Sequence, residues 1–401
     1  MNTSKNILVI TYWGFNSPIL QSYALPYIKI LKKNLMPGGR IFLFTLTPVK
    51  DNNEANYQKI KSKFNNEGIT LVNYTYSPFG LKMSAKFIAI FFALVTLTLK
   101  NQISYIHCWC TPGGAIGYIV SLFTGKPLVL DSFEPHAQSM VETNTWKKNS
   151  AAFKILFNLE KLQLKRASFV ICAAQGMIAY SQKVYGIIKT KYSVKPACVD
   201  LELFSKKEKD FSLVPGIDQN SIVCVYVGKF GDIYLSQEVF NFFKIAHSYL
   251  GTNFKVLLLT NHADEEINMY CRNANLNRNV VLKYFVEHKN VPDYMSLGHF
   301  GICPVKPVPT KEFCTPIKNA EYWAMGLPVV ITKNISTDSK LIDDNNIGYV
   351  LKELNDAEYL NAVKKIQELL QDNSLDKKIR GIAEKYRNYS IAEQIYSSLN
   401  V

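Results

Sequence analysis

The sequence has 401 residues, of which 48% are hydrophobic and 19% charged, enough apolar material for two to three domains. This hydrophobic content excludes a disordered chain, and the mean hydropathy of −0.02 excludes a polytopic membrane protein. Residues 1–200 carry 23 basic and 8 acidic side chains, a net charge of +15, whereas residues 201–401 carry 23 and 24, a net charge of −1. This asymmetry predicts two domains, the first of which faces an anionic partner.

The chain starts with one lysine, a short apolar run at 6–10 and no cleavage site. We interpret this start as a first β-strand rather than a signal peptide. The eight cysteines are scattered, and most lie in apolar runs where cysteine behaves as a small hydrophobic residue. We therefore expect a reducing, cytoplasmic environment without a disulfide framework.

In the first half, short apolar runs predict strands at 6–10, 41–46, 69–73, 103–107, 127–131 and 169–173. Amphipathic stretches between them predict helices, among them 20–34, 114–124 and 150–166. In the second half, we predict strands at 222–228, 254–260, 280–284, 298–303, 328–332 and 348–351. Strands that are apolar on both faces and separated by helices predict two α/β domains, each a doubly wound, Rossmann-like parallel sheet.

The segment 87–99 contains thirteen consecutive residues without a charge, and Lys82, Lys86 and Lys100 flank it. A membrane-spanning helix needs about 20 apolar residues. Thirteen residues favour a buried core helix first and a helix on a membrane surface second.

A charged stretch that begins at Ser205 and ends near Pro215 separates the two series of strands and helices. We predict a first domain at 1–204 and a second at 205–387, with a C-terminal helix at 388–401 that packs back on the first domain. Ligands bind at the carboxyl ends of the strands in such sheets. We therefore expect the site in a central cleft between the two domains.

The segment that follows residue 314 is the strongest candidate site. Thr315 suits an N-cap, Pro316 suits the first helical position, and a helix N-terminus offers free N–H groups to a phosphate. Lys318 and Glu321 are three residues apart and share a face. Glu321 lies about 9 Å from the helix start, roughly the span from a pyrophosphate to a ribose, whose hydroxyls a carboxylate can accept. The alternative is a surface ion pair between Lys318 and Glu321.

Three other turns at predicted strand ends carry possible chemistry. In the turn at 228–231, Lys229 could meet a phosphate, or the turn could be an ordinary βα connection. From Asp131 to His136, two carboxylates and a histidine could do acid–base or sugar-binding work, or form a plain polar loop. Gly14 permits close approach of a ligand, or serves packing around a tight turn.

Metal binding is not expected. The cysteines of His107-Cys108-Trp109-Cys110 are too close together for a zinc site, and no second pair of Cys or His residues follows. The sequence has no D-x-D at a strand end for Mg²⁺ and a diphosphate.

The segment 315–330 resembles the nucleotide-binding signature of glycosyltransferase family 4, retaining enzymes with two Rossmann-like domains in the GT-B fold. The branch that it resembles reads S-P-x-K-x-x-E-Y-x-A-x-G-x-P-V, matched here by Thr315, Pro316, Lys318, Glu321, Tyr322, Ala324, Gly326, Pro328 and Val329. Further blocks in the family's order cover nearly the whole chain, at 107, 113–114, 125–131, 160–161, 167–172, 185–186, 195–204 and 226–229. Two positions depart from the family: Phe313 replaces the first glutamate of the E-x7-E pattern, and no second basic residue occurs near Leu235.

The resemblance implies roles for residues of the second domain. Glu321 would hold the donor ribose, and Lys318 and Lys229 would neutralise the leaving diphosphate. Gly228 would let the donor approach the backbone. The helix start that receives the diphosphate would be formed by Thr315, Pro316 and Ile317.

In the first domain, the resemblance implies that Gly14 lies under the donor phosphates across the cleft. The loop from Asp131 to His136 would face the transferred sugar and the acceptor. No metal or other cofactor would be needed, because lysines and the helix dipole stabilise the diphosphate.

The expected function is therefore transfer of a sugar, with retention, from a nucleotide-diphosphate donor to a glycan or lipid-linked acceptor. Surface polysaccharide or lipopolysaccharide assembly is the expected setting, at the inner face of the cell membrane, with an anionic membrane surface or lipid diphosphate facing the basic first domain. The alternatives are a sugar-nucleotide epimerase on the same scaffold and a basic nucleic-acid-binding protein. The sequence has no zinc finger, RNP-like motif or helix-turn-helix signature, so no nucleic-acid partner is expected.

Overall fold

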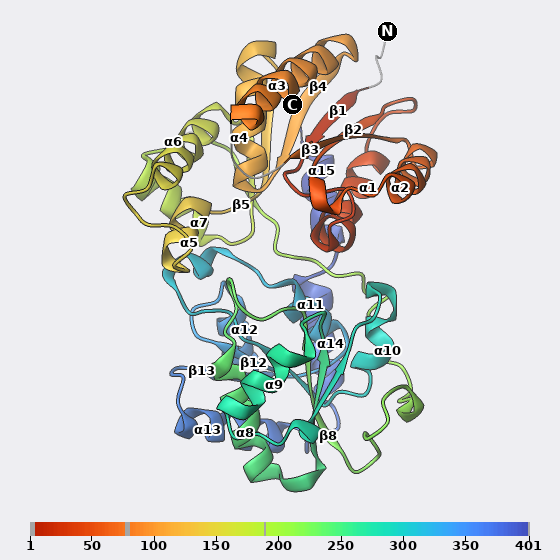
Figure 1. The fold of residues 1–401 in the computed structure, drawn as a ribbon, viewed down its shortest axis with the longest axis vertical. Coiled ribbons are helices and arrows are strands. Elements are labelled where there is room, and N and C mark those ends of the chain that lie inside the picture. Colours follow the sequence, from red (N-terminus) through yellow and green to blue (C-terminus); the bar gives the residue numbers. More distant parts are fainter. Residues whose placement is uncertain (1–4, 77–80, 188–189, 400–401) are drawn as a thin grey trace. The chain divides into compact units, whose positions relative to one another are not determined.

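A computed structural model describes residues 5–76, 81–187 and 190–399. The chain divides into two compact units, one of residues 1–195 with 390–401 and one of residues 196–389. Within the described residues, the first unit contains a seven-stranded sheet and the second a six-stranded sheet, and helices cover the faces of both (Figure 1). The boundary predicted from the sequence, 204/205, lies nine residues after this one, 195/196.

The first domain has the strand order β3-β2-β1-β4-β5-β6-β7, and all neighbouring strands are parallel. Its strands are β1 (Asn6–Ile10), β2 (Ile41–Pro48), β3 (Ile69–Tyr76), β4 (Ile103–Trp109), β5 (Leu128–Phe133), β6 (Phe169–Cys172) and β7 (Tyr192–Val194). Its helices are η1 (Leu20–Ala24), α1 (Leu25–Lys33), η2 (Val49–Asp51), α2 (Glu54–Asn66), α3 (Leu81–Lys100), α4 (Cys110–Thr124), α5 (His136–Glu142), α6 (Ala151–Arg166), α7 (Gly176–Tyr180), η3 (Ser181–Tyr185) and α15 (Ser390–Ser397).

The second domain has the order β10-β9-β8-β11-β12-β13, again with parallel neighbours. Its strands are β8 (Ile222–Val227), β9 (Phe254–Leu259), β10 (Val281–Tyr284), β11 (Phe300–Cys303), β12 (Val329–Thr332) and β13 (Gly348–Leu351). Its α-helices are α8 (Gln237–Leu250), α9 (Asp264–Asn273), α10 (Val291–Met295), α11 (Ile317–Ala324), α12 (Asp338–Asn345), α13 (Asp356–Leu369) and α14 (Leu375–Tyr386). Short 3-10 turns lie at Phe211–Leu213, Gly251–Asn253, Arg278–Val280, His288–Asn290 and Pro309–Phe313.

The predicted doubly wound α/β architecture is confirmed, and the sequence explains it locally. Strands such as β1 and β12 are buried along nearly their whole length, because their residues are apolar on both faces. Polar caps start several helices: the Ser150 hydroxyl accepts a hydrogen bond from the Phe153 N–H, and the Asn355 side chain accepts one from the Glu358 N–H. The short strand β7 was not predicted, since its three residues are only half-buried.

Helix α3 contains the uncharged run at 87–99. Ile90 and Leu94 are buried, whereas Phe92 is 61% exposed. The interpretation of this run as a buried core helix therefore holds for one face only. No helix in the described part of the chain combines the length and the apolar character needed to cross a bilayer.

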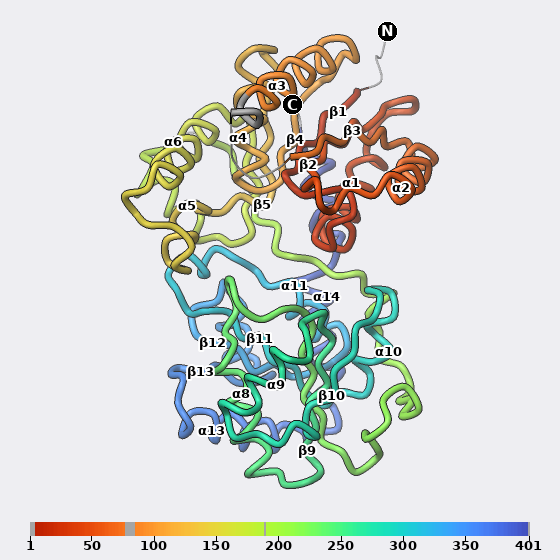
Figure 2. Tube along the Cα trace, in the orientation of Figure 1, coloured from red at the N-terminus to blue at the C-terminus, as the bar shows by residue number. Residues whose placement is uncertain are grey.

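The C-terminal helix α15 is part of the first unit, where it contacts α1. Figure 2 shows the corresponding blue end of the trace beside the red N-terminal segments. Tyr396 of this helix is buried, 4% exposed. The last helix thus contributes to the core of the domain in which the chain begins.

Candidate functional site

The start of helix α11 is formed differently from the prediction. Pro316, not Thr315, is the N-cap residue, and Ile317 is the first helical residue. The Thr315 hydroxyl instead accepts a hydrogen bond of 2.8 Å from the Ala197 N–H. The N–H groups of the first turn thus have no side-chain cap, which leaves them available to an anion.

Lys318 lies in the first turn of α11 and is buried, 6% exposed. Its ammonium nitrogen lies 3.6 Å from the ring centroid of Tyr234 and 4.5 Å from that of Tyr226, and 3.4 Å from the Tyr226 hydroxyl oxygen. Burial lowers the pKa of Lys318 to about 8, although Cys303 and Glu321 act in the opposite direction. None of the ion pairs among the described residues includes Lys318, so this buried cation is available to neutralise an anion.

Gly228 brings the turn after β8 against this lysine. A Cβ added to Gly228 would lie 3.5 Å from the Lys318 nitrogen, and the φ of 120° at this position is rarely adopted by other residues. Two segments that the sequence singled out, about 90 residues apart, therefore meet at one place. This is the carboxyl edge of the second sheet, where ligands of such domains bind.

Lys229 extends from the same turn into solvent, where it pairs with Asp232 at 2.7 Å. The backbone beneath it is held by two hydrogen bonds: the Tyr226 hydroxyl donates to the Lys229 carbonyl at 2.5 Å, and the Phe230 N–H donates to the His262 ring at 2.8 Å. The turn is thus fixed while the lysine side chain is free to reorient. An exposed ion pair of this kind is worth little and is readily exchanged for a ligand phosphate.

Glu321 lies one turn further along α11, and its side chain is only 8% exposed. Its Oε1 lies 2.9 Å from Nε2 of His288, a residue that the sequence did not single out. Burial alone would lower the pKa of His288, but the hydrogen bond and charge of Glu321 raise it above its usual value. The alternative of a surface ion pair between Lys318 and Glu321 is wrong, since both are buried and Glu321 pairs with His288.

In the first domain, we predicted a loop from Asp131 to His136, and this prediction is wrong for the first half of the segment. Asp131 belongs to strand β5 and has no exposed surface. Its Oδ2 lies 3.0 Å from Nε2 of His107 and accepts a hydrogen bond of 2.6 Å from the Tyr396 hydroxyl. Its Oδ1 lies 3.1 Å from the ammonium nitrogen of Lys195. Burial alone would raise the pKa of Asp131, but these partners hold it well below its usual range. A carboxylate enclosed in this way cannot touch a substrate, so we reassign Asp131 as a structural and positioning residue.

Lys195 completes this cluster as a fully buried cation. Besides Asp131, it faces the ring of Tyr27 at 3.6 Å and that of Trp109 at 4.7 Å. Aromatic faces attract a cation, and a paired carboxylate offsets much of its desolvation. The cluster therefore ties β4, β5, the end of β7 and helix α15 together.

His136 and Glu134 lie at the carboxyl end of β5, where both side chains are partly exposed. The His136 Nδ1 is 3.5 Å from a carboxylate oxygen of Glu134, and His136 is the first residue of α5. Buried Glu160 accepts the Ala137 N–H and the Tyr185 hydroxyl, each at 2.8 Å, and so fixes the start of this helix. Burial raises the pKa of Glu160 to about 7. The groups of this loop that can meet a substrate are thus Glu134 and His136.

Gly14 follows β1, and an added Cβ would lie 3.1 Å from the Thr47 hydroxyl oxygen. The same hydroxyl accepts the Phe15 N–H at 3.3 Å, and Phe15 is completely buried. Packing around this turn accounts for the glycine without a ligand.

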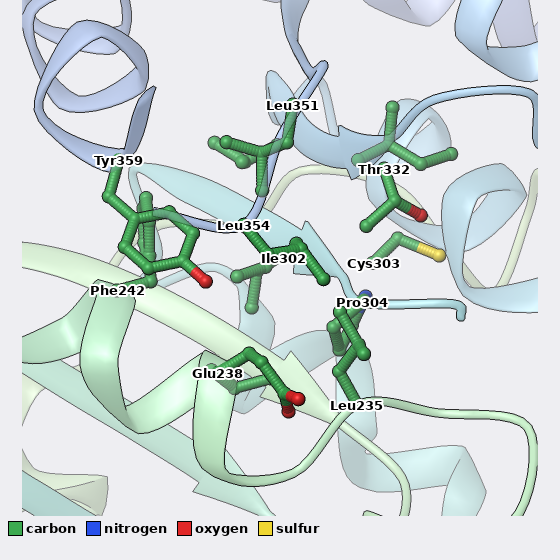
Figure 3. A pocket seen from close by; sticks show the side chains of 13 residues that line it. Leu235, Glu238, Phe242, Ile302, Cys303, Pro304, Thr332, Leu351, Leu354 and Tyr359 are labelled. Carbon is green, nitrogen blue, oxygen red and sulfur yellow. The ribbon is translucent and has the colours of Figure 1, made fainter. Parts of the chain in front are cut away.

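An apolar pocket in the second domain is lined by a different set of residues (Figure 3). It is lined mainly by apolar side chains such as Leu235, Phe242 and Leu351, with Glu238 and Tyr359 as polar neighbours. None of the predicted donor-binding residues lines it. A nucleotide diphosphate needs cations and hydrogen-bond donors, so this pocket is a packing gap between α8 and α13 rather than the donor site.

Among the described residues, Cys108 and Cys110 are not part of a disulfide, and Cys108 is buried in β4. Among the described residues, no three His, Cys, Asp or Glu side chains are grouped so as to hold a metal ion.

Residues 248–395 match a family model described as glucosyltransferase 3-like, C-terminal domain. No curated protein sequence gives a significant match. Sucrose-phosphate synthase from Thermosynechococcus elongatus is similar in structure, with a TM-score of 0.73 at 15% identity over 98% of this chain and 97% of that one. The fold is GT-B.

Two further GT-B structures are similar over almost their full length. HepE of Anabaena in complex with UDP and glucose has a TM-score of 0.71 at 16% identity over 99% of both chains. WaaG, a glycosyltransferase involved in lipopolysaccharide biosynthesis, has a TM-score of 0.70 at 14% identity over 98% of this chain and 99% of that one. At these identities, the similarity shows the fold alone.

Proposed function

We propose that this chain is a retaining glycosyltransferase that moves a sugar from a nucleotide-diphosphate donor to a glycan or lipid-linked acceptor. The observation that carries the proposal is the buried Lys318, which has no carboxylate partner among the described residues and lies against Gly228 at the uncapped start of α11. A diphosphate in this position would receive backbone N–H groups and a desolvated cation together. The family match at 248–395 includes α11 and supports the same chemistry.

In the proposed reaction, the bond between the anomeric carbon and the diphosphate oxygen breaks, and the acceptor hydroxyl attacks from the same face. The leaving phosphate takes the hydroxyl proton. Lys318 and the N-terminus of α11 stabilise the charge that develops on the diphosphate, and Lys229 turns from Asp232 towards it. These groups supply the positive charge, so the proposed mechanism uses no metal, as in glycosyltransferase family 4.

Glu321 is the proposed ribose ligand. Its Oε1 is held by His288, and its second carboxylate oxygen can accept ribose hydroxyls. HepE has been crystallised with UDP and with UDP-glucose, which supports a UDP-sugar donor here. In the first domain, the partly exposed His136 and Glu134 are the proposed contacts for the sugar and the acceptor.

The setting that we propose is surface polysaccharide or lipopolysaccharide assembly in the cytoplasm, at the inner face of the membrane. The description of WaaG as a lipopolysaccharide enzyme supports this setting, and the basic first half supports an anionic or lipid-linked acceptor.

An epimerase on the same scaffold would need several acid–base groups around the sugar. The burial of Asp131 removes one of them and disfavours that alternative.

Thermal-shift measurements with UDP-, GDP-, CDP- and ADP-sugars test the proposal. A donor present at 100 times its dissociation constant should stabilise the chain by about 2.7 kcal/mol. We expect sugars of one nucleotide class to stabilise the chain. When an acceptor is added, the transferred sugar should keep the anomeric configuration that it has in the donor, as measured by NMR of the product. Absence of stabilisation by all four classes would refute donor binding, and a second sugar nucleotide formed without acceptor would indicate the epimerase.

A further inference from the structure

Helices α3 and α4 of the first domain expose large apolar side chains. On α3, Ile88 is 59% and Phe92 61% exposed, and on α4, Leu122 is 51% and Phe123 68% exposed. Together these helices form what we call the docking surface, which consists of Phe87, Ile88, Phe92, Leu99, Ile119, Leu122 and Phe123. Apolar groups of this size, gathered on one face, mark sites of interaction.

The two helices form one continuous surface. The rings of Phe91 and Phe123 lie 4.9 Å apart across the helix pair, and Phe91 also contacts Phe92 at 5.2 Å. The opposite face of α3 is well packed, since Ile90 and Leu94 are 3% and 1% exposed. The exposure is therefore a property of one face and does not come from a loosely packed helix.

The charge around the docking surface has a single sign. Residues 68–130, which include both helices, contain no Asp or Glu and four lysines. Lys100 ends α3 and is exposed, and Lys126 follows α4. An apolar face with lysines at its margins is typical of helices that lie in the interface of a membrane with anionic lipids.

A second copy of the chain fits this surface less well. In a two-fold symmetric dimer the same patch meets itself, which would bring the lysines of one copy near those of the other. With no acidic side chain between residues 68 and 130, these helices supply no charge to offset that repulsion.

We propose that the docking surface binds an anionic phospholipid bilayer, with α3 and α4 lying in the plane of the membrane. The apolar side chains would enter the boundary between headgroups and acyl chains, while the lysines contact lipid phosphates. The docking surface uses none of the residues of the proposed donor site. Vesicle binding and donor binding can therefore fail independently of each other.

Flotation of the full chain with lipid vesicles tests this proposal. We expect binding to vesicles with 30% phosphatidylglycerol to be at least tenfold stronger than to pure phosphatidylcholine, and to weaken as salt is raised. The triple substitution Ile88→Ser, Phe92→Ser and Phe123→Ser should reduce binding at least tenfold. Met269→Ser, which changes an exposed methionine on α9 of the second domain, is the matched control and should bind as the unaltered chain does.

Charge reversal supplies a second variant that leaves the apolar residues in place. Lys100→Glu with Lys126→Glu should weaken binding to anionic vesicles at least tenfold, with an unchanged circular dichroism spectrum and melting temperature. The proposal is overturned if the unaltered chain does not bind anionic vesicles, or if neither variant changes binding. It is also overturned if sedimentation shows a dimer that the triple substitution dissociates while vesicles recruit nothing.

Discussion

Glu321 and His288 form a hydrogen bond of 2.9 Å between Oε1 and Nε2 in the second domain. The histidine is 41% exposed and the carboxylate 8%, so His288 covers the outer side of Glu321. One carboxylate oxygen is thereby fixed in position, which pre-orients the other for a ligand. His288 acts through Glu321 and is a positioning residue.

Substitution of Glu321 by Gln should lower the affinity for UDP at least tenfold, because the amide has one accepting oxygen in place of two and carries no charge. The unaltered chain should prefer UDP to 2′-deoxy-UDP, and the variant should not discriminate between them. Titration calorimetry with both nucleotides measures this. An undiminished preference for the ribose form in the variant would exclude Glu321 as the ribose ligand.

Substitution of Lys318 by Met should lower kcat by about 10²–10³, the usual loss when one preorganised group at a developing charge is removed. The same variant should be as stable as the unaltered chain or more so, because the buried ammonium no longer has to be desolvated. Initial rates and urea unfolding give the two readouts. Loss of activity together with loss of stability would point to a purely structural lysine.

The affinity for UDP should depend on pH through Lys318. Its pKa is lowered to about 8 in the free protein, so the ammonium is present below pH 8 and is lost as the pH rises above it. A bound diphosphate favours the charged form, and the dissociation constant should therefore rise as the pH increases above about 8. Calorimetry from pH 6 to 9.5 tests this, and the Lys318→Met variant should lack the rise.

Substitution of Gly228 by Ala should weaken UDP binding at least tenfold. The φ of 120° is strained for alanine, and the added methyl group would lie 3.5 Å from the Lys318 nitrogen. Gly381→Ala is the matched control, because its added Cβ meets nothing within 4 Å on helix α14. The control should be neutral or slightly stabilising. Equal UDP affinity in both variants would contradict the placement of a ligand beside Gly228.

Substitution of Asp131 by Asn should destabilise the chain by about 3–5 kcal/mol, since it leaves the buried Lys195 without its counter-charge. Tyr396→Phe, which removes one hydrogen bond to the same carboxylate, should cost about 1 kcal/mol. Because the folded-state pKa of Asp131 is lowered, its contribution is present at neutral pH and is lost only as the pH falls below about 4. Urea unfolding at pH 7 measures both variants, and an unaffected Asp131→Asn variant would contradict this role.

The sheets could be predicted from the sequence because their signal is local. A strand such as β12 is apolar on both faces, and Gly326 ends the preceding helix with a φ of 73°. The meeting of Gly228 with Lys318 could be anticipated, since Gly228 follows strand β8 and Lys318 lies at the start of the helix between β11 and β12 of the same sheet. The pairing of His288 with Glu321 could not be predicted, because no local sequence pattern links two positions that are 33 residues apart.

The burial of Asp131 could not be predicted from the sequence for the same reason. A carboxylate after an apolar run looks like the first residue of a polar loop, and only its partners reveal the core position. One of those partners, Tyr396, is 265 residues away in the sequence. Thr315 was likewise assigned from its preference for N-caps, whereas its hydroxyl accepts the Ala197 N–H.

The hydrogen bond from Tyr396 to Asp131 affects the order in which the two domains can complete folding during translation. Domains usually fold in order as they leave the ribosome, the N-terminal one first. Here the residues of the second domain, 196–389, are all translated before Tyr396 can reach the core of the first domain. The domain that is made first is therefore the last to be completed.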